Sequence, residues 1–263
     1  MDANCKIKKM KAKKSLGQNF LKSALALKKI VESGEIKKSD TILEIGPGKG
    51  ALTEELLKTG AKVFAVEKDT ELFSFLQNKF ALHINSGSLV LVNGDIQEFQ
   101  ASAYGLKPSA YKIIANIPYN ITGAILKKFL TEQNQPERMI LMVQHEVAKR
   151  IVAGDKKESI LSISVKAYGE PKMVMKVPAR YFSPAPKVDS AVIAIKHISR
   201  KKFTENQVNE EKFWEIVKHG FAHKRKQLAG NLKMVVSNEI LIKFGQKRAE
   251  DLTLEDWFYI SSN

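Results

Sequence analysis

The chain has 263 residues, and its 43 Lys and Arg against 28 Asp and Glu give a formal net charge of +15 and an isoelectric point near 9.6. This excess favours a polyanionic partner through counterion release. Cys5 is the only cysteine, which excludes an internal disulfide and a cysteine-based metal cluster, and the histidines show no metal-ligand spacing, so no metal is expected. No apolar stretch is long enough for a membrane helix and no secretory signal precedes Lys6, so we expect a cytoplasmic protein.

Basic residues crowd the two ends of the chain. Near the N-terminus they are Lys6, Lys8, Lys9, Lys11, Lys13 and Lys14, and near the C-terminus they are Lys224, Arg225, Lys226, Lys243, Lys247 and Arg248. Runs of this kind usually form solvated tails that touch phosphates. Residues 1–15 are therefore predicted to be a basic flexible tail, and their lack of Arg argues against a mitochondrial presequence.

Apolar runs and helical stretches alternate through the first half of the chain. Strands are predicted near 41–46, 62–67, 88–92 and 112–117, and helices near 22–34, 50–59, 70–82 and 121–131. A βαβ rhythm of this kind indicates a mostly parallel sheet.

A glycine-rich turn, Gly46-Pro47-Gly48-Lys49-Gly50, follows the first of these strands and precedes a helix. Glycines allow positive φ and close approach of a ligand, and the helix N-terminus presents free amide donors. The spacing differs from the dinucleotide-binding fingerprint and lacks the ending of a phosphate-binding P-loop, so a nicotinamide enzyme and an NTPase are disfavoured.

Acidic residues end the next two strands. Glu67 lies about 20 residues beyond the first glycine, the separation at which an acidic group meets ribose hydroxyls. Asp95 follows the strand that ends near Val92 and is placed to accept a hydrogen bond from the amine of a cofactor adenine. Either residue taken alone is as well explained by a solvated strand end or a local turn. The series Gly46, Glu67, Asp95 and Asn116 falls where open α/β sheets bind ligands.

The tetrad Asn116-Ile117-Pro118-Tyr119 ends the fourth strand. An adenine N6 amine is a poor nucleophile because its lone pair is delocalised, and two acceptors holding its hydrogens would turn that pair toward an incoming methyl group. Asn116 offers a side-chain oxygen, and Pro118 fixes the carbonyl of Ile117 by restricting that residue to an extended conformation. Tyr119 offers a face for base stacking. An ordinary proline turn with a buried tyrosine is the alternative that the four residues alone leave open.

The second half of the chain no longer shows the alternation of strands and helices. Runs at 173–177 and 191–196 are predicted to be an antiparallel pair at one sheet edge, and from 199 onward apolar residues recur at helical spacing. We therefore expect three parts: the tail at 1–15, a larger α/β domain at 16–199, and a helical domain at 200–263. The last is short enough that it should pack on the larger one.

The chain resembles the rRNA adenine N6,N6-dimethyltransferases, and most closely their bacterial small-subunit branch. The resemblance begins at 16–21, continues through 44–53, Glu67, 94–95 and 116–119, and includes Pro178 to Ser190 and Phe221 to Leu228. The last two blocks are the most specific, since generic methyltransferases lack them. Ile117 replaces the more usual Leu, and Lys224-Arg225-Lys226 replaces two arginines and a lysine.

This resemblance implies a Rossmann-like class I methyltransferase with a mostly parallel seven-stranded sheet and a small all-α C-terminal domain. The implied cofactor is S-adenosylmethionine, at Asn19, Leu21, Gly46, Gly48, Glu67, Asp95, Ile96 and Asn116. Catalytic positions would be Asn116, Ile117, Pro118, Tyr119 and Phe182, with Phe182 clamping the adenine against Tyr119. RNA contacts would come from Lys14, Lys187, Lys224, Arg225 and Lys226.

The implied reaction is methylation of N6 on two adjacent adenosines in a hairpin loop near the 3′ end of 16S rRNA, by a monomer with a role in small-subunit biogenesis. Three alternatives stay open. The Asn-Ile-Pro-Tyr motif also occurs in large-subunit methyltransferases of the macrolide-resistance type. A non-catalytic assembly factor would keep the fold without the chemistry, and DNA adenine methyltransferases use a related tetrad, although usually with a second proline where Ile117 stands.

Overall fold

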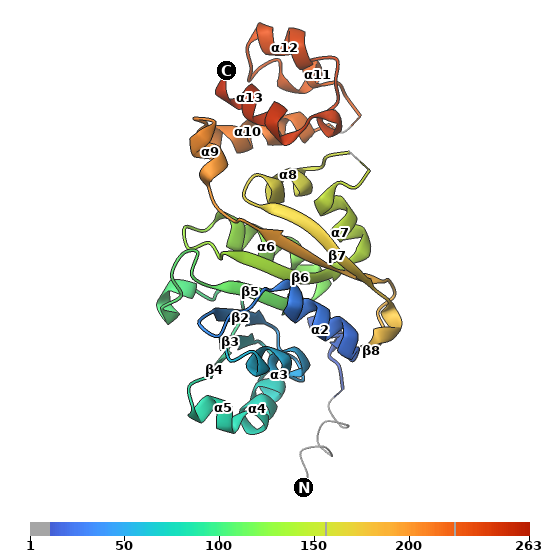
Figure 1. Cartoon of the computed structure of the whole chain (residues 1–263). Helices are drawn as coiled ribbons and strands as arrows, with labels where there is room; N and C mark the ends of the chain where they lie inside the picture. The colour runs from blue at the N-terminus through green and yellow to red at the C-terminus, as the bar shows by residue number, and fades with distance from the viewer. Residues whose placement is uncertain (1–10, 156, 224) are drawn as a thin grey trace. The chain divides into compact units, whose positions relative to one another are not determined.

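The computed structural model describes residues 11–155, 157–223 and 225–263, and this part of the chain divides into two compact units (Figure 1). The larger unit comprises the described residues up to Ala148 together with Lys172–Ile198, and the smaller comprises Lys149–Pro171 and Ser199–Asn263. Most of the predicted N-terminal tail, residues 1–10, lies outside the described residues.

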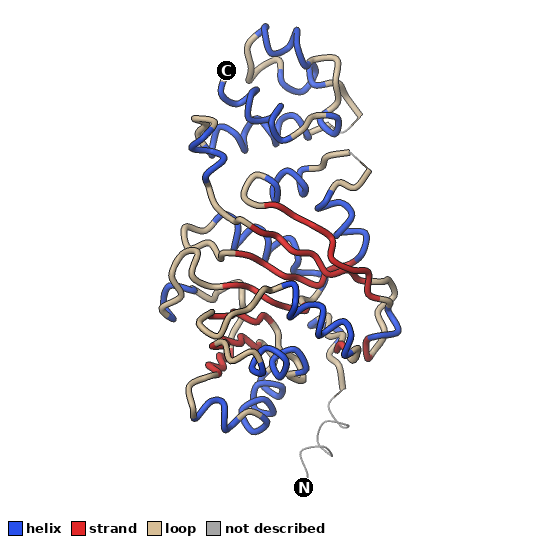
Figure 2. Tube along the Cα trace, in the orientation of Figure 1, coloured by secondary structure: helices blue, strands red, loops and turns tan. Residues whose placement is uncertain are grey.

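A seven-stranded sheet of order β4-β3-β2-β5-β6-β9-β7 organises the larger unit (Figure 2). Its strands are β2 (Thr41–Ile45), β3 (Lys62–Glu67), β4 (Leu89–Asn93), β5 (Lys112–Asn116), β6 (Arg138–Gln144), β7 (Glu170–Val177) and β9 (Ser190–Lys196). Strands β2 to β6 pair in parallel, and β9 pairs antiparallel with β6. The mostly parallel seven-stranded sheet predicted from the sequence is confirmed, with β9 and β7 adjacent at one edge.

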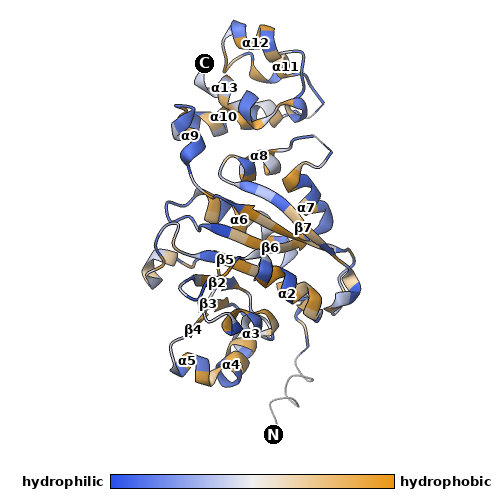
Figure 3. Cartoon of the chain, in the orientation of Figure 1, coloured by the Kyte–Doolittle hydropathy of each residue, from blue (hydrophilic) through white to orange (hydrophobic). Residues whose placement is uncertain are grey.

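The central strands are buried because neighbouring strands and helices cover them. Residues Met139 to Val143 of β6 are fully buried, whereas β7 at the edge is exposed or half-buried at every position before its last residue, the buried Val177. Figure 3 shows the same contrast, with β6 coloured hydrophobic and β7 mixed. A continuous apolar run is typical of a strand that is covered on both faces.

The helices of the larger unit follow the predicted alternation. They are α2 (Ala24–Ser33), α3 (Ala51–Lys58), α4 (Thr70–Lys79), α5 (Ala81–Asn85) and α6 (Thr122–Thr131), with α7 (His145–Val152) crossing into the smaller unit. Short 3-10 turns are η1 (Lys14–Leu16), η2 (Ala101–Tyr104), η3 (Tyr119–Ile121) and η4 (Ala179–Tyr181). The helix predicted at 70–82 is broken at Phe80, whose φ of −111° and ψ of 25° are not helical.

A two-stranded sheet was not predicted. Strand β1 (Phe20–Leu21) pairs antiparallel with β8 (Phe182–Ser183), so Phe20 lies opposite Ser183 and Leu21 opposite Phe182. Two residues are too few to show a hydrophobic period in the sequence. The pairing brings the N-terminal motif at 16–21 beside the proline-rich block.

The smaller unit is helical, which confirms the predicted all-α character of the C-terminal part. Its elements are α8 (Ile160–Lys166), α9 (Lys201–Glu205), α10 (Glu210–Phe221), α11 (Leu228–Leu232), α12 (Asn238–Phe244), η5 (Ala249–Asp251) and α13 (Leu254–Ser262). Phe203, Phe213 and Phe258 form an aromatic cluster in its core, with ring centroids 4.7 to 5.3 Å apart.

The division into units differs from the predicted domain bounds at one segment. Residues 149–171 were expected in the α/β domain, but the structure groups them with the helical unit. The backbone amide of Glu158 donates to the carbonyl of Glu250 at 2.8 Å, and Lys157 pairs with Glu250 at 3.3 Å. Contacts so distant in sequence leave no local pattern. Across the described residues no helix is both long and apolar enough to cross a membrane.

Candidate functional site

A cavity of about 520 Å³ opens where β2, β3 and β5 end, in the larger unit. Its size is that of a small-molecule site, and the carboxyl ends of parallel strands are where open α/β sheets bind ligands. The predicted residues that line it are Asn19, Leu21, Gly46, Gly48, Glu67, Asp95, Ile96, Asn116, Ile117, Pro118 and Tyr119. The structure therefore brings the glycine turn and the tetrad to one cavity.

The glycine turn depends on backbone conformations that side chains disfavour. Gly46, Gly48 and Gly50 have φ values of 63°, 61° and 76°. A Cβ on Gly50 would lie 2.5 Å from the ring of Phe80, whereas a Cβ on Gly46 would meet nothing within 4 Å. Gly50 thus lets the start of α3 pack closely, and Gly46 leaves the backbone open to a ligand.

Glu67 connects β3 to this turn. One carboxylate oxygen accepts from the amide of Gly48 at 3.0 Å, and the other accepts from the amide of Asp69 at 2.9 Å. The side chain is buried, and this burial raises the pKa of the Glu67 carboxyl. A buried, hydrogen-bonded carboxylate at a cavity wall is suited to accept from ligand hydroxyls.

Asp95 lies at the cavity edge just beyond β4. Its carboxylate accepts from the ammonium of Lys68 at 2.7 Å and from the amide of Gln97 at 2.9 Å. The hydrogen bond from Lys68 lowers the pKa of the Asp95 carboxyl, so the group is an ionised acceptor at neutral pH.

Glu44 is a candidate site residue that the sequence predictions did not include. It lies in β2, is 1 % exposed, lines the cavity, and its Oε2 has no hydrogen-bond partner among the described residues. Burial raises the pKa of the Glu44 carboxyl to about 8. A buried carboxyl oxygen without a partner is costly, and a ligand cation would supply the missing partner. The available signal was an acidic residue within an otherwise apolar strand, directly before the glycine turn.

The side chains of the tetrad are held by specific hydrogen bonds. The amide nitrogen of Asn116 donates to the carbonyl of Asn19 at 3.2 Å, which leaves its oxygen as the acceptor. Ile117 is 2 % exposed. The hydroxyl of half-buried Tyr119 lies 2.6 Å from that of Ser190, which fixes the ring, and burial raises the pKa of the Tyr119 phenol.

Phe182 is not placed on the cavity wall. It was predicted to clamp a base against Tyr119, but its ring is 2 % exposed and belongs to the hydrophobic core. The alternation of β8 explains this position, because Ser183 faces the cavity and its neighbour must face away. Phe20 lines the cavity instead, with the ammonium of Lys49 4.9 Å from its ring centroid. A role for Phe182 against a base stays a prediction.

The predicted RNA contacts are distributed over both units. Lys187 is exposed in the larger unit, and Arg225 and Lys226 are exposed in the smaller one. Lys224 and the side chain of Lys14 lie outside what the structure describes. Within the described residues, no group of three or more His, Cys, Asp or Glu is placed to hold a metal ion.

Comparison with known sequences finds close relatives over nearly the whole chain. Residues 9–262 match the family model for ribosomal RNA adenine dimethylase. A ribosomal RNA small subunit methyltransferase A from Dehalococcoides mccartyi strain CBDB1 is 39 % identical over 94 % of this chain and 87 % of its own length. A protein of the same name from Thermosynechococcus vestitus is also 39 % identical, over 96 % of each chain.

Solved structures share the fold. A dimethyladenosine transferase from Plasmodium falciparum superimposes with a TM-score of 0.78 at 26 % identity, covering 92 % of this chain and 95 % of that one. The 23S rRNA methyltransferase ErmE superimposes with a TM-score of 0.75 at 24 % identity, covering 93 % of this chain and all of that one. The second likeness bears on the fold alone.

Proposed function

Because the chain belongs to the ribosomal RNA adenine dimethylase family, we propose that it methylates N6 of two adjacent adenosines in a hairpin loop near the 3′ end of 16S rRNA. The enzyme is an S-adenosylmethionine-dependent rRNA adenine methyltransferase by that membership. One observation carries the proposal: the glycine turn and the tetrad at 116–119 line one cavity.

The residues of this cavity fit the methyl donor. When bound, S-adenosylmethionine supplies an electrophilic methyl group on a sulfonium centre. Glu44 offers the unpaired carboxyl oxygen that an amino-acid ammonium requires, and Glu67 offers acceptors for ribose hydroxyls. Asp95 would accept a hydrogen bond from the adenine amine of the bound cofactor, and the open backbone at Gly46 would let the ligand approach closely.

Asn116 and Ile117 orient the nucleophile. The side-chain oxygen of Asn116 and the carbonyl of Ile117 accept the two hydrogens of the N6 amine, which directs its lone pair toward the methyl group. As the new bond forms, positive charge grows on the amine, and these two acceptors stabilise it. A strong general base is unnecessary, because the methylated amine loses its proton easily.

Tyr119 supplies the stacking face for the base. Its hydroxyl contact with Ser190 at 2.6 Å holds the ring in place, so the ring loses little conformational entropy when the base binds. Stacking on an aromatic face is worth about 1–3 kcal/mol per base. Phe182 would join this clamp only after leaving the core position that it occupies here.

An unpaired loop adenosine in the small subunit is the proposed substrate. Sequence-specific RNA recognition favours unstacked loop bases, and extruding an unpaired base costs less than opening a duplex. The net charge of +15 supports an RNA partner, with Lys187, Arg225, Lys226, Lys14 and Lys224 as the proposed contacts. We extend the proposal to a monomeric enzyme in the cytoplasm that takes part in small-subunit biogenesis.

Replacing Asn116 tests the proposal. Asn116→Ala should keep calorimetric affinity for S-adenosylmethionine within a few-fold but lower methyl transfer to purified small subunits by about 100-fold or more. Asn78→Ala is the matched control, because Asn78 is exposed on α4 and lies outside the cavity lining. Unchanged turnover in Asn116→Ala refutes the assigned role, and transfer to large subunits or DNA instead of small subunits refutes the assigned substrate.

A further inference from the structure

The cavity has one wall that comes from the N-terminus rather than from the sheet. Residues 15–22 all line it. This segment is anchored at its C-terminal end, where Phe20 and Leu21 pair with β8 and the amide of Lys22 donates to the carbonyl of Tyr181 at 2.8 Å. Access to the cavity past this wall therefore depends on the contacts that hold the N-terminal end of the segment.

The other end is held by Asp69, a buried residue outside the cavity lining. Its carboxylate accepts from the ammonium of Lys13 at 2.9 Å and from the side-chain amide of Gln18 at 2.8 Å. It also caps α4 by accepting from the amide of Glu71 at 3.0 Å. Asp69 is 4 % exposed, so little water reaches its carboxylate.

Gln18 completes a closed set of bonds. Its side-chain oxygen accepts from the backbone amide of Lys13 at 2.8 Å, while its nitrogen donates to Asp69. Both ends of the Gln18 amide are thus used within this cluster. Gly17, with a φ of 64°, makes the turn that places Gln18 between the cavity and Asp69.

The same cluster touches the ligand-facing carboxylate. The backbone amide of Asp69 donates to Glu67 at 2.9 Å, and Glu67 also accepts from Gly48. One continuous series of hydrogen bonds therefore runs from the glycine turn through Glu67 and Asp69 to the N-terminal segment. Glu67 and Asp69 are therefore linked directly, so a change in the hydrogen bonds of Glu67 acts on Asp69, which holds the N-terminal segment.

We propose that Asp69 is a positioning residue that closes residues 13–22 over the cofactor cavity, and that its bonds to Lys13 and Gln18 set the rate of cofactor exchange. The inference rests on the proposed function for the identity of the ligand. Two methyl groups on each of two adenosines require a new cofactor for every transfer, so the cavity must open repeatedly. The Lys13 side chain is 38 % exposed, and water can compete for it, which makes the closure reversible.

Cofactor release measured without RNA tests this proposal. Asp69→Asn keeps the size and the helix-capping oxygen but removes the charge, and Gln18→Ala removes the second bond without touching α4. Both variants should release S-adenosylmethionine and S-adenosylhomocysteine about ten-fold faster in stopped-flow experiments. The KM for S-adenosylmethionine should rise by a similar factor, while kcat at saturating cofactor changes much less.

Glu71→Gln is the matched control. The Glu71 carboxylate also pairs with Lys13, at 3.2 Å, but its side chain is 69 % exposed. The hydrogen bonds of the Gln18 side chain go to Lys13 and Asp69 and not to Glu71. Its release rates should equal those of the wild type. Gln18→Ala should keep a single cooperative urea transition, which shows that the variant is folded when its release rate is measured.

Unchanged release in both Asp69→Asn and Gln18→Ala would overturn the proposal, as would a fall in kcat without a change in KM. Because release is measured in the absence of RNA, these results are independent of the RNA substrate. A wild-type protein that binds the cofactor but methylates no RNA would count against the proposed function and leave the closure by Asp69 standing.

Discussion

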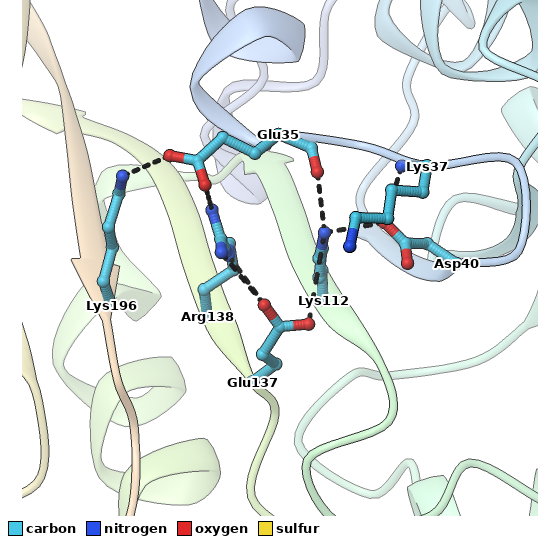
Figure 4. A network of polar contacts seen from close by, with 7 residues as sticks. All are labelled: Glu35, Lys37, Asp40, Lys112, Glu137, Arg138 and Lys196. Carbon is cyan, nitrogen blue, oxygen red and sulfur yellow. Dashed lines mark hydrogen bonds and ion pairs between the residues drawn. The ribbon is translucent and has the colours of Figure 1, made fainter.

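The two ends of the same parallel strands carry polar clusters that differ in how their charges are paired. At the amino ends, Lys112, Arg138, Glu35 and Asp40 form a network in which opposite charges meet (Figure 4). At the carboxyl ends, Glu44 keeps an unpartnered oxygen beside a cavity. The difference indicates that one end of the sheet stabilises the fold, while the other retains binding capacity for ligands.

The amino-end network ties the loop after α2 to the sheet. The ammonium of Lys112, whose side chain is 4 % exposed, lies 2.6 Å from Asp40 and donates to the carbonyl of Glu35 at 2.9 Å. Figure 4 shows the Glu35 carboxylate between Arg138 and Lys196, both of which pair with it. These charges are satisfied by the protein itself.

Breaking the amino-end network should have the largest effect. Lys112→Ala removes a buried ammonium and leaves the half-buried Asp40 carboxylate with the backbone amide of Lys37 as its remaining donor, so we expect the free energy of unfolding to fall by about 3 kcal/mol. Urea denaturation measures this loss. Lys58→Ala, at an exposed pair with Glu55 of 2.7 Å, is the control and should cost no more than about 1 kcal/mol. Equal losses in the two variants would contradict the contrast between a structural network and surface pairs.

The carboxyl-end cluster should respond in the opposite way. Glu44→Gln removes a buried carboxyl of which one oxygen has no partner among the described residues, so the free energy of unfolding should stay equal or rise. Affinity for S-adenosylmethionine should fall by about ten-fold or more, or about 1.4 kcal/mol. Calorimetry and urea denaturation measure the two quantities. A loss of stability without a loss of affinity would show that Glu44 is structural.

The pH dependence of stability sharpens the comparison further. The folded-state pKa of Glu44, about 8, lies above its unfolded value, so its contribution to stability is present at low pH and is lost as pH rises from about 4.5 to about 8. Pairing with Lys196 and Arg138 lowers the pKa of Glu35 to about 2, so its contribution is present above about pH 4.5 and is lost as pH falls toward 2. When the free energy of unfolding is measured from pH 3 to pH 8.5, its decrease toward alkaline pH should be smaller in Glu44→Gln than in the wild type. Its decrease toward acid pH should be smaller in Glu35→Gln. The reverse pattern, or no change in either variant, would contradict the assigned protonation states.

The smallest effect is expected for Tyr119→Phe. Tyr119→Phe loses the hydroxyl contact with Ser190 but keeps the ring, so unfolding should cost about 1 kcal/mol less and turnover should stay within a few-fold. Tyr119→Ala should lose far more turnover, because it removes the stacking face. Steady-state kinetics with small subunits compares the two variants. Equal turnover in Phe and Ala would show that the ring does not hold the base.

The sequence predicted what local patterns encode. Glycine spacing, strand-end acids and the tetrad each follow an apolar run, and parallel pairing then places them at one sheet edge, which is why the structure brings these predicted residues to one cavity. Glu44 was not predicted, because an acidic residue inside an apolar strand has no distinctive spacing of its own, and Phe20 and Gln18 of the N-terminal segment were not predicted either.

Features that depend on contacts distant in sequence were missed. Phe182 lies in β8, which pairs with β1, and it is buried. A two-residue strand is too short to show an alternating hydrophobic pattern in the sequence. The bonds from Lys13 and Gln18 to Asp69 span more than 50 positions. The grouping of 149–171 with the helical unit has the same origin.

Mass spectrometry of nucleosides from small subunits tests the central claim most directly. After incubation with methyl-labelled S-adenosylmethionine, wild-type protein should yield labelled N6,N6-dimethyladenosine, and Asn116→Ala should yield almost none. Label on another nucleoside, or equal dimethyladenosine from both proteins, would contradict the assignment of the 116–119 tetrad as the site of adenine methylation.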